Sequence, residues 1–144
     1  MRQIALVAVS ATFFIGSAIG ADALDSKASW PDTVSMAKDA GVDYPATVRR
    51  ARHGDRKALA TLFALSPRMD GSGADSHASV LRLLLQSLGD RSFSHALSKQ
   101  SQKHRQRVIH DLDYDFRHPW RKQFPLTYAL GSHDQKLLHE SADT

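Results

Sequence analysis

Apolar residues recur at three- and four-residue spacing along most of the chain, which is typical of amphipathic helices. One stripe comprises Ala58, Leu59, Leu62, Phe63 and Leu65. A longer and wider stripe runs from about Ala74 to Leu88, and we expect it to be the most buried element. The pattern predicts an all-α fold, either a small bundle or a short stack of antiparallel α-hairpins.

Prolines and glycines divide this pattern into short helices. A helix is expected to open at Pro31, where the missing N–H has no cost, and to end at Gly41. A turn over residues 42–45 should precede a helix over 46–53, and residues 70–73 should form a flexible loop. Further along, a helical stripe is expected to reach His118, followed by an irregular segment from Trp120 to Gly131. The Ser132–Gln135 segment fits a capping box that would start a last short helix.

One joint between helices occurs twice. Gly54-Asp55-Arg56 recurs as Gly89-Asp90-Arg91, at an offset of 35 residues (89 − 54). A glycine can adopt the left-handed conformation that ends one helix, and the following aspartate can cap the next. Each joint therefore predicts two antiparallel helices packed side by side.

Between Pro45 and Ser101 the chain resembles the α-hairpin repeat families, such as HEAT and tetratricopeptide proteins, in this joint and in its apolar spacing. The resemblance implies stacked hairpins with a binding surface, and it transfers no catalytic residue. Because a Gly-Asp pair has capping value of its own, the offset is also compatible with chance recurrence.

The N-terminal residues have the layout of a secretory signal peptide. Arg2 is followed by an apolar run from Ile4 to Ile19, and Ala21-Asp22-Ala23 provides small residues for cleavage. The run is short for a membrane anchor, which is the alternative. We expect residues 1–23 to be a cleaved signal peptide, 24–29 a disordered lead-in, 30–139 a helical domain and 140–144 a frayed tail.

The composition of the chain indicates its cellular compartment and the kind of partner that it binds. The chain has no cysteine, a net charge of +4 and an isoelectric point near 9.6. An exported domain without disulfides favours the bacterial periplasm, or a secreted protein, and must be held together by packing alone. A basic surface attracts anionic envelope components. Nucleic acid is not expected as a partner, because export removes the chain from the compartment that holds it.

Two groups of basic residues are the candidate binding site. The first basic cluster is Arg49, Arg50, Arg52, Arg56 and Lys57, and the second basic cluster is Lys99, Lys103, Arg105 and Arg107. Both could also be solvated helix faces, as charge runs usually are. Their functional interpretation is a patch for an anionic partner.

Candidate catalytic and metal-binding patterns are weaker. Ser35-Met36-Ala37-Lys38 matches the Ser-x-x-Lys motif of penicillin-recognising enzymes, but its companion motifs are missing. Asp111, Asp113 and Asp115 alternate between His110 and His118, yet residues two apart on a helix diverge by about 200°. We expect no metal site and no cofactor.

The sequence therefore predicts an exported, non-enzymatic helical protein that binds a protein or an anionic envelope component. The alternative is a small periplasmic enzyme or metal-handling protein that uses the histidines and aspartates near residues 110–118.

Overall fold

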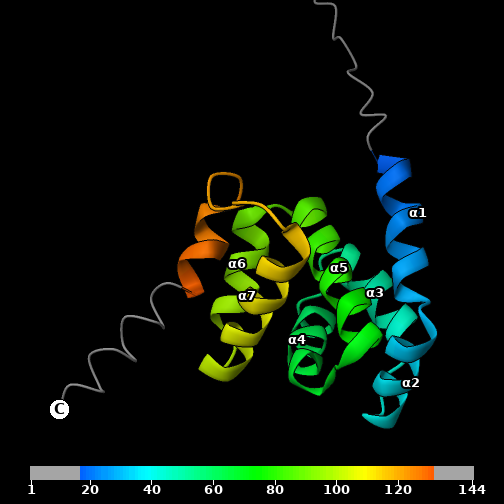
Figure 1. Ribbon diagram of the computed structural model, residues 1–144. Coiled ribbons are helices and arrows are strands. Elements are labelled where there is room, and N and C mark those ends of the chain that lie inside the picture. The colour runs from blue at the N-terminus through cyan, green and yellow to red at the C-terminus, as the bar shows by residue number, and fades with distance from the viewer. Residues whose placement is uncertain (1–16, 132–144) are drawn as a thin grey trace, which may run out of the picture.

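The computed structural model describes residues 17–131, and all regular secondary structure in that range is helical (Figure 1). The helices are α1 (Ser17–Ala28), α2 (Pro31–Asp39), α3 (Tyr44–Arg52), α4 (Arg56–Leu65), the 3₁₀ turn η1 (Ser66–Arg68), α5 (Gly71–Leu88), α6 (Asp90–Ser98) and α7 (Gln102–Phe116). Residues 125–131 form a further helix. The all-α prediction is confirmed for this part of the chain. No helix within it is long and apolar enough to cross a bilayer.

Helix α5 is the centre of the molecule. It packs against α1, α2 and α3 on one side and against α6 and α7 on the other (Figure 1). Val80, Leu81, Leu84 and Leu85 are completely buried. The expectation that this stripe is the most buried element is therefore confirmed.

The core is continuous from α1 to the segment beyond α7. It joins Leu24 of α1 to Trp120, and aromatic rings fill its second half. Phe63 and Phe93 meet edge to face at 5.2 Å between ring centroids, and Phe116 stacks on Trp120 at 5.2 Å. Such pairs contribute about 0.5–1.5 kcal/mol beyond the area that they bury.

The prediction of a disordered lead-in at residues 24–29 is wrong. Residues up to Ala28 belong to α1, and Leu24 and Ala28 are each only 2% exposed. The two side chains are four residues apart, so they share one helix face. That face packs on α5, where Ser76 Oγ donates a hydrogen bond to the Lys27 carbonyl at 2.8 Å.

The flexible loop predicted at residues 70–73 is helical from Gly71 onward. The physical reason is the close approach of α2. A Cβ atom on Gly73 would lie 2.8 Å from Met36 Sδ, and Thr33 Oγ1 donates to the Gly73 carbonyl at 3.0 Å. Glycine lets Met36 pack directly on this turn, and tertiary contact overrides its low helix propensity.

Other predicted boundaries shift for local reasons. Helix α3 starts at Tyr44 because Asp43 caps it, accepting from the Ala46 N–H at 3.1 Å, and Pro45 fits the first turn. Helix α7 ends at Phe116, where Arg117 adopts a left-handed φ of 54°. The irregular segment expected over 120–131 is helical in its second half.

Several predictions fall outside the described residues. They are most of the apolar run of the signal peptide, the capping box at Ser132 and the frayed tail at 140–144.

Candidate functional site

The glycines of the two Gly-Asp-Arg joints share a positive φ, of 85° at Gly54 and 84° at Gly89. Gly89 has a ψ of 159°, which lies outside the left-handed helical region that the capping argument predicts. At the first joint the aspartate behaves as predicted. Asp55 Oδ1 accepts from the N–H groups of Lys57 at 2.9 Å and Ala58 at 3.1 Å, which caps α4.

The second aspartate does something else. Helix α6 begins at Asp90 itself, so this residue is not its cap. The Asp90 carboxylate instead accepts from the N–H groups of Leu126 and Thr127, both at 2.8 Å. These are N–H groups of the first turn of the 125–131 helix, which Asp90 therefore caps from 36 residues away. The prediction that Asp90 caps α6 is wrong.

The fold brings both joints to one groove of about 440 Å³. We call it the joint groove. Arg56 comes from the first joint and Arg91 from the second, and α4 and α6 form its walls. The lining residues are Gly54, Arg56, Leu59, Leu88, Arg91, Ser92, His95 and Ala96.

The two arginines of the joint groove are exposed and carry unneutralised charge. None of the ion pairs found among the described residues includes Arg56 or Arg91. The nearest acid in sequence to Arg56 is Asp55, and its Oδ1 is engaged at the α4 cap. Both guanidinium groups are thus available to an anion in solution.

The structure divides the first basic cluster. Arg49, Arg50 and Lys57 are exposed, as is Arg56. Arg52 is half-buried and faces Asp25 of α1, with 3.9 Å between Nη1 and the carboxylate oxygen. Arg52 therefore helps to hold α1 on α3, whereas the rest of the cluster remains free for contact.

The second basic cluster is divided in the same way. Lys99 and Lys103 are exposed, whereas Arg105 is half-buried and donates to the Gln100 carbonyl at 2.8 Å. Arg107 pairs with Asp111 at 3.0 Å and reaches the Met69 carbonyl at 3.5 Å. Two of its four cations are thus bound within the protein.

The two clusters do not merge into one patch. The second cluster borders η1, which follows the C-terminal end of α4, and Lys103 and Arg107 line a separate hollow there with Pro67. The first cluster surrounds the N-terminal end of α4. A ten-residue helix is about 15 Å long, so Lys103 and Arg107 lie at the opposite end of α4 from the first cluster.

A buried chain of polar side chains was not predicted. His77 of α5 is completely buried, with Tyr44 Oη 2.6 Å from Nδ1 and Ser66 Oγ 2.9 Å from Nε2. Burial, and secondarily the nearby Arg107 charge, lowers the pKa of His77 to about 3. The imidazole is therefore neutral at physiological pH.

The same chain continues to α7. Ser66 hydrogen-bonds the carboxylate of Asp111, which is paired with Arg107. Burial raises the pKa of Asp111 despite these favourable partners. No sequence signal distinguishes His77 from the other histidines, because its partners are 11 and 33 residues away.

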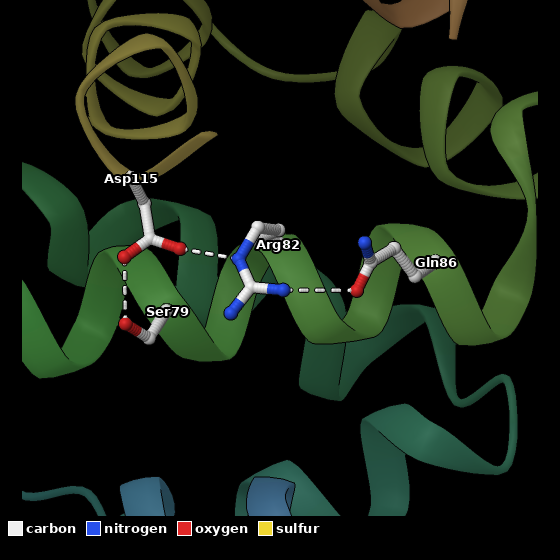
Figure 2. Close-up of polar contacts among 4 residues, drawn as sticks. All are labelled: Ser79, Arg82, Gln86 and Asp115. Atoms are coloured by element: carbon white, nitrogen blue, oxygen red, sulfur yellow. Dashed lines mark hydrogen bonds and ion pairs between the residues drawn. The ribbon is translucent and has the colours of Figure 1, made fainter. Parts of the chain in front are cut away.

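The three alternating aspartates diverge, as their spacing predicts. Asp111 binds Arg107, and Asp113 accepts from Trp120 Nε1 at 2.7 Å. Asp115 accepts from Ser79 Oγ at 2.7 Å and from Arg82 Nε at 2.5 Å, which joins α7 to α5 (Figure 2). No three histidine or acidic side chains converge within residues 17–131. The Ser35 and Lys38 side chains are both exposed on α2.

Comparison of the chain with protein-family models, with curated proteins and with solved structures gives no significant match.

Proposed function

We propose that this protein is an exported, non-enzymatic helical protein that binds an anionic partner at the joint groove. An acidic component of the envelope is the first choice, and an acidic protein surface is the alternative. The observation that carries this proposal is the presence of Arg56 and Arg91, far apart in sequence and unpaired, in the wall of one groove.

The chemistry of arginine supports the proposal. A guanidinium group presents several N–H donors in a plane and binds carboxylate or phosphate through two parallel hydrogen bonds. Arg49, Arg50 and Lys57 lie beside the same joint and are exposed. They would add long-range attraction for an anion, which weakens as salt is added.

Export and the hairpin arrangement belong to the same proposal. Residues 1–23 would be a cleavable signal peptide that directs the chain to the bacterial periplasm or the medium. The pairs α3–α4 and α5–α6, each in mutual contact, would be antiparallel hairpins side by side. Such a pairing is supported by the common groove that their two joints line.

The test is a paired charge reversal with a matched control. Arg56→Glu/Arg91→Glu alters the joint groove, and Lys99→Glu/Lys103→Glu makes the same change in net charge at two exposed positions that do not line it. Co-sedimentation with vesicles of phosphatidylglycerol and phosphatidylcholine should show that the groove variant binds about tenfold more weakly, roughly 1.4 kcal/mol. The control should stay within about twofold of the parent at moderate salt.

Two outcomes would contradict the proposal. Equal loss in both variants would mean that binding follows net charge and not the groove. Full binding by the groove variant, both to vesicles and to partners cross-linked in intact envelopes, would exclude Arg56 and Arg91 as the contact.

A further inference from the structure

The joint groove is not polar throughout. Leu59 and Ala96 line it from the buried side, at 2% and 8% exposure, and Leu88 adds a half-buried apolar side chain. Arg56, Arg91, Ser92 and His95 are the exposed polar residues around this apolar floor. The groove therefore offers a cationic rim and, mainly at Leu88, a small apolar surface to one ligand.

This combination restricts the chemistry of the ligand. A small polar anion would pair with the arginines and leave the apolar floor wet. A neutral apolar molecule would cover the floor and desolvate two cations without pairing them, which costs free energy. A ligand with an apolar chain and an anionic head satisfies both surfaces at once.

We propose that the joint groove binds a single-chain amphiphile with a carboxylate or phosphate head. This inference rests on the proposed function and specifies the anion. The head pairs with Arg56 and Arg91, and Ser92 and His95 add hydrogen-bonding groups beside it. The chain lies over Leu88 and the accessible edges of Leu59 and Ala96. A volume of about 440 Å³ falls in the range of about 300–1,000 Å³ that small-molecule sites occupy.

The inference predicts how affinity depends on the chain. Each fully buried methylene contributes about 0.8 kcal/mol, or about fourfold in affinity. Because the groove is open on one side, we expect a smaller gain, about twofold per methylene, from octanoate to dodecanoate in isothermal titration calorimetry, below their micelle concentrations. Decanoate should bind about tenfold more tightly than decanol, and decyltrimethylammonium should not bind.

Two variants separate the head site from the chain site. Arg56→Gln/Arg91→Gln should abolish the preference for decanoate over decanol. Ser92→Trp, at an exposed position of the groove, should fill it and reduce decanoate binding at least tenfold. Ser98→Trp is the matched control, because Ser98 is exposed on the same helix but does not line the groove.

The outcomes distinguish this inference from the proposed function. Affinity independent of chain length, or unchanged in Ser92→Trp, would overturn the inference even if vesicle binding still required the arginines. Absence of both vesicle and decanoate binding would overturn both. A comparison of decanoate with decyl phosphate identifies the preferred head group. A fatty acid carries a carboxylate, whereas the other candidate lipid carries a phosphate.

Discussion

At the residue scale, the buried chain through His77 has complementary roles at its two sides. Because one nitrogen of a neutral imidazole donates and the other accepts, Tyr44 Oη at Nδ1 and Ser66 Oγ at Nε2 take opposite roles. Burial, with the Asp111 charge as a second cause, raises the pKa of Tyr44 well above its usual value, so the phenol stays protonated. Every polar group in this chain has a partner, as a buried network requires.

His77 makes the stability of the protein depend on pH. The unfolded side chain takes up a proton as pH falls through about 6.5, whereas the folded one stays neutral until about pH 3. Unfolding therefore takes up a proton between about pH 6.5 and pH 3. The free energy of unfolding consequently decreases as the pH is lowered through this window. One full proton corresponds to about 1.4 kcal/mol per pH unit.

Asp111 acts in the opposite direction. Its pKa is raised in the folded state. Its contribution to stability is therefore complete below the pKa of the unfolded state and is lost as pH rises through the pKa of the folded state. It thereby moderates the loss of stability in acid. Urea denaturation of the parent and of His77→Gln between pH 7 and pH 4.5 measures the histidine contribution as a difference in slope.

We expect the slope of His77→Gln to be shallower by up to one proton. At pH 7 the variant should also be less stable by about 1–3 kcal/mol, because Tyr44 or Ser66 loses a partner. If the variant does not fold, the imidazole ¹³C shift of His77 in the parent gives its pKa directly. Parallel slopes, or a pKa near 6.5, would contradict the assignment.

Little of this buried chain could be predicted. Apolar spacing correctly places core residues such as Leu84 and Leu62, but it does not mark a polar side chain that is buried with partners. His77 was missed as a core residue because its partners come from other elements. The divergence of Asp111, Asp113 and Asp115 was predicted, since it depends only on helix geometry.

At the scale of elements, the equivalent aspartates of the two Gly-Asp-Arg joints cap helices in different positions. Asp55 caps the helix that follows it, and Asp90 caps the distant 125–131 helix. The positive φ of each glycine was predicted because it is local. The target of Asp90 could not be predicted, because it depends on how the C-terminal segment crosses α6.

Substitution of these two aspartates should have separate local effects. Asp90→Ala should lower the free energy of unfolding by about 1–2 kcal/mol, since it removes two charge-assisted hydrogen bonds. Amide hydrogen exchange should speed up at Leu126 and Thr127 in Asp90→Ala, and at Lys57 and Ala58 in Asp55→Ala. Faster exchange at the same amides in both variants would contradict the distinction.

At the scale of the whole molecule, apolar spacing predicted the all-α class and the approximate positions of the helices. It did not predict which helices pack against each other. The predicted cleavage point after Ala23 falls inside α1, and the residues just beyond it are part of the core. The helix in the lead-in was missed because six residues of mixed polarity show no period that a pattern could detect.

Leu24 tests the place of this segment in the fold. Leu24→Ala should lower the free energy of unfolding by about 2–3 kcal/mol, because it opens a cavity between α1 and α5. Ser26→Ala, at an exposed position of the same helix, is the control and should change it by less than about 0.5 kcal/mol. Equal, small effects in urea denaturation would mean that α1 does not belong to the stable core.

The central position of α5 also sets an order on assembly. Synthesis proceeds from the N-terminus, and α1 and α2 find most of their packing on a helix whose last turn ends at Leu88. A nascent chain that stops before Gly71 lacks that surface entirely. Helices α1 and α2 must therefore leave the ribosome before the surface that buries most of their apolar faces exists, and those faces stay open to other binders during that interval.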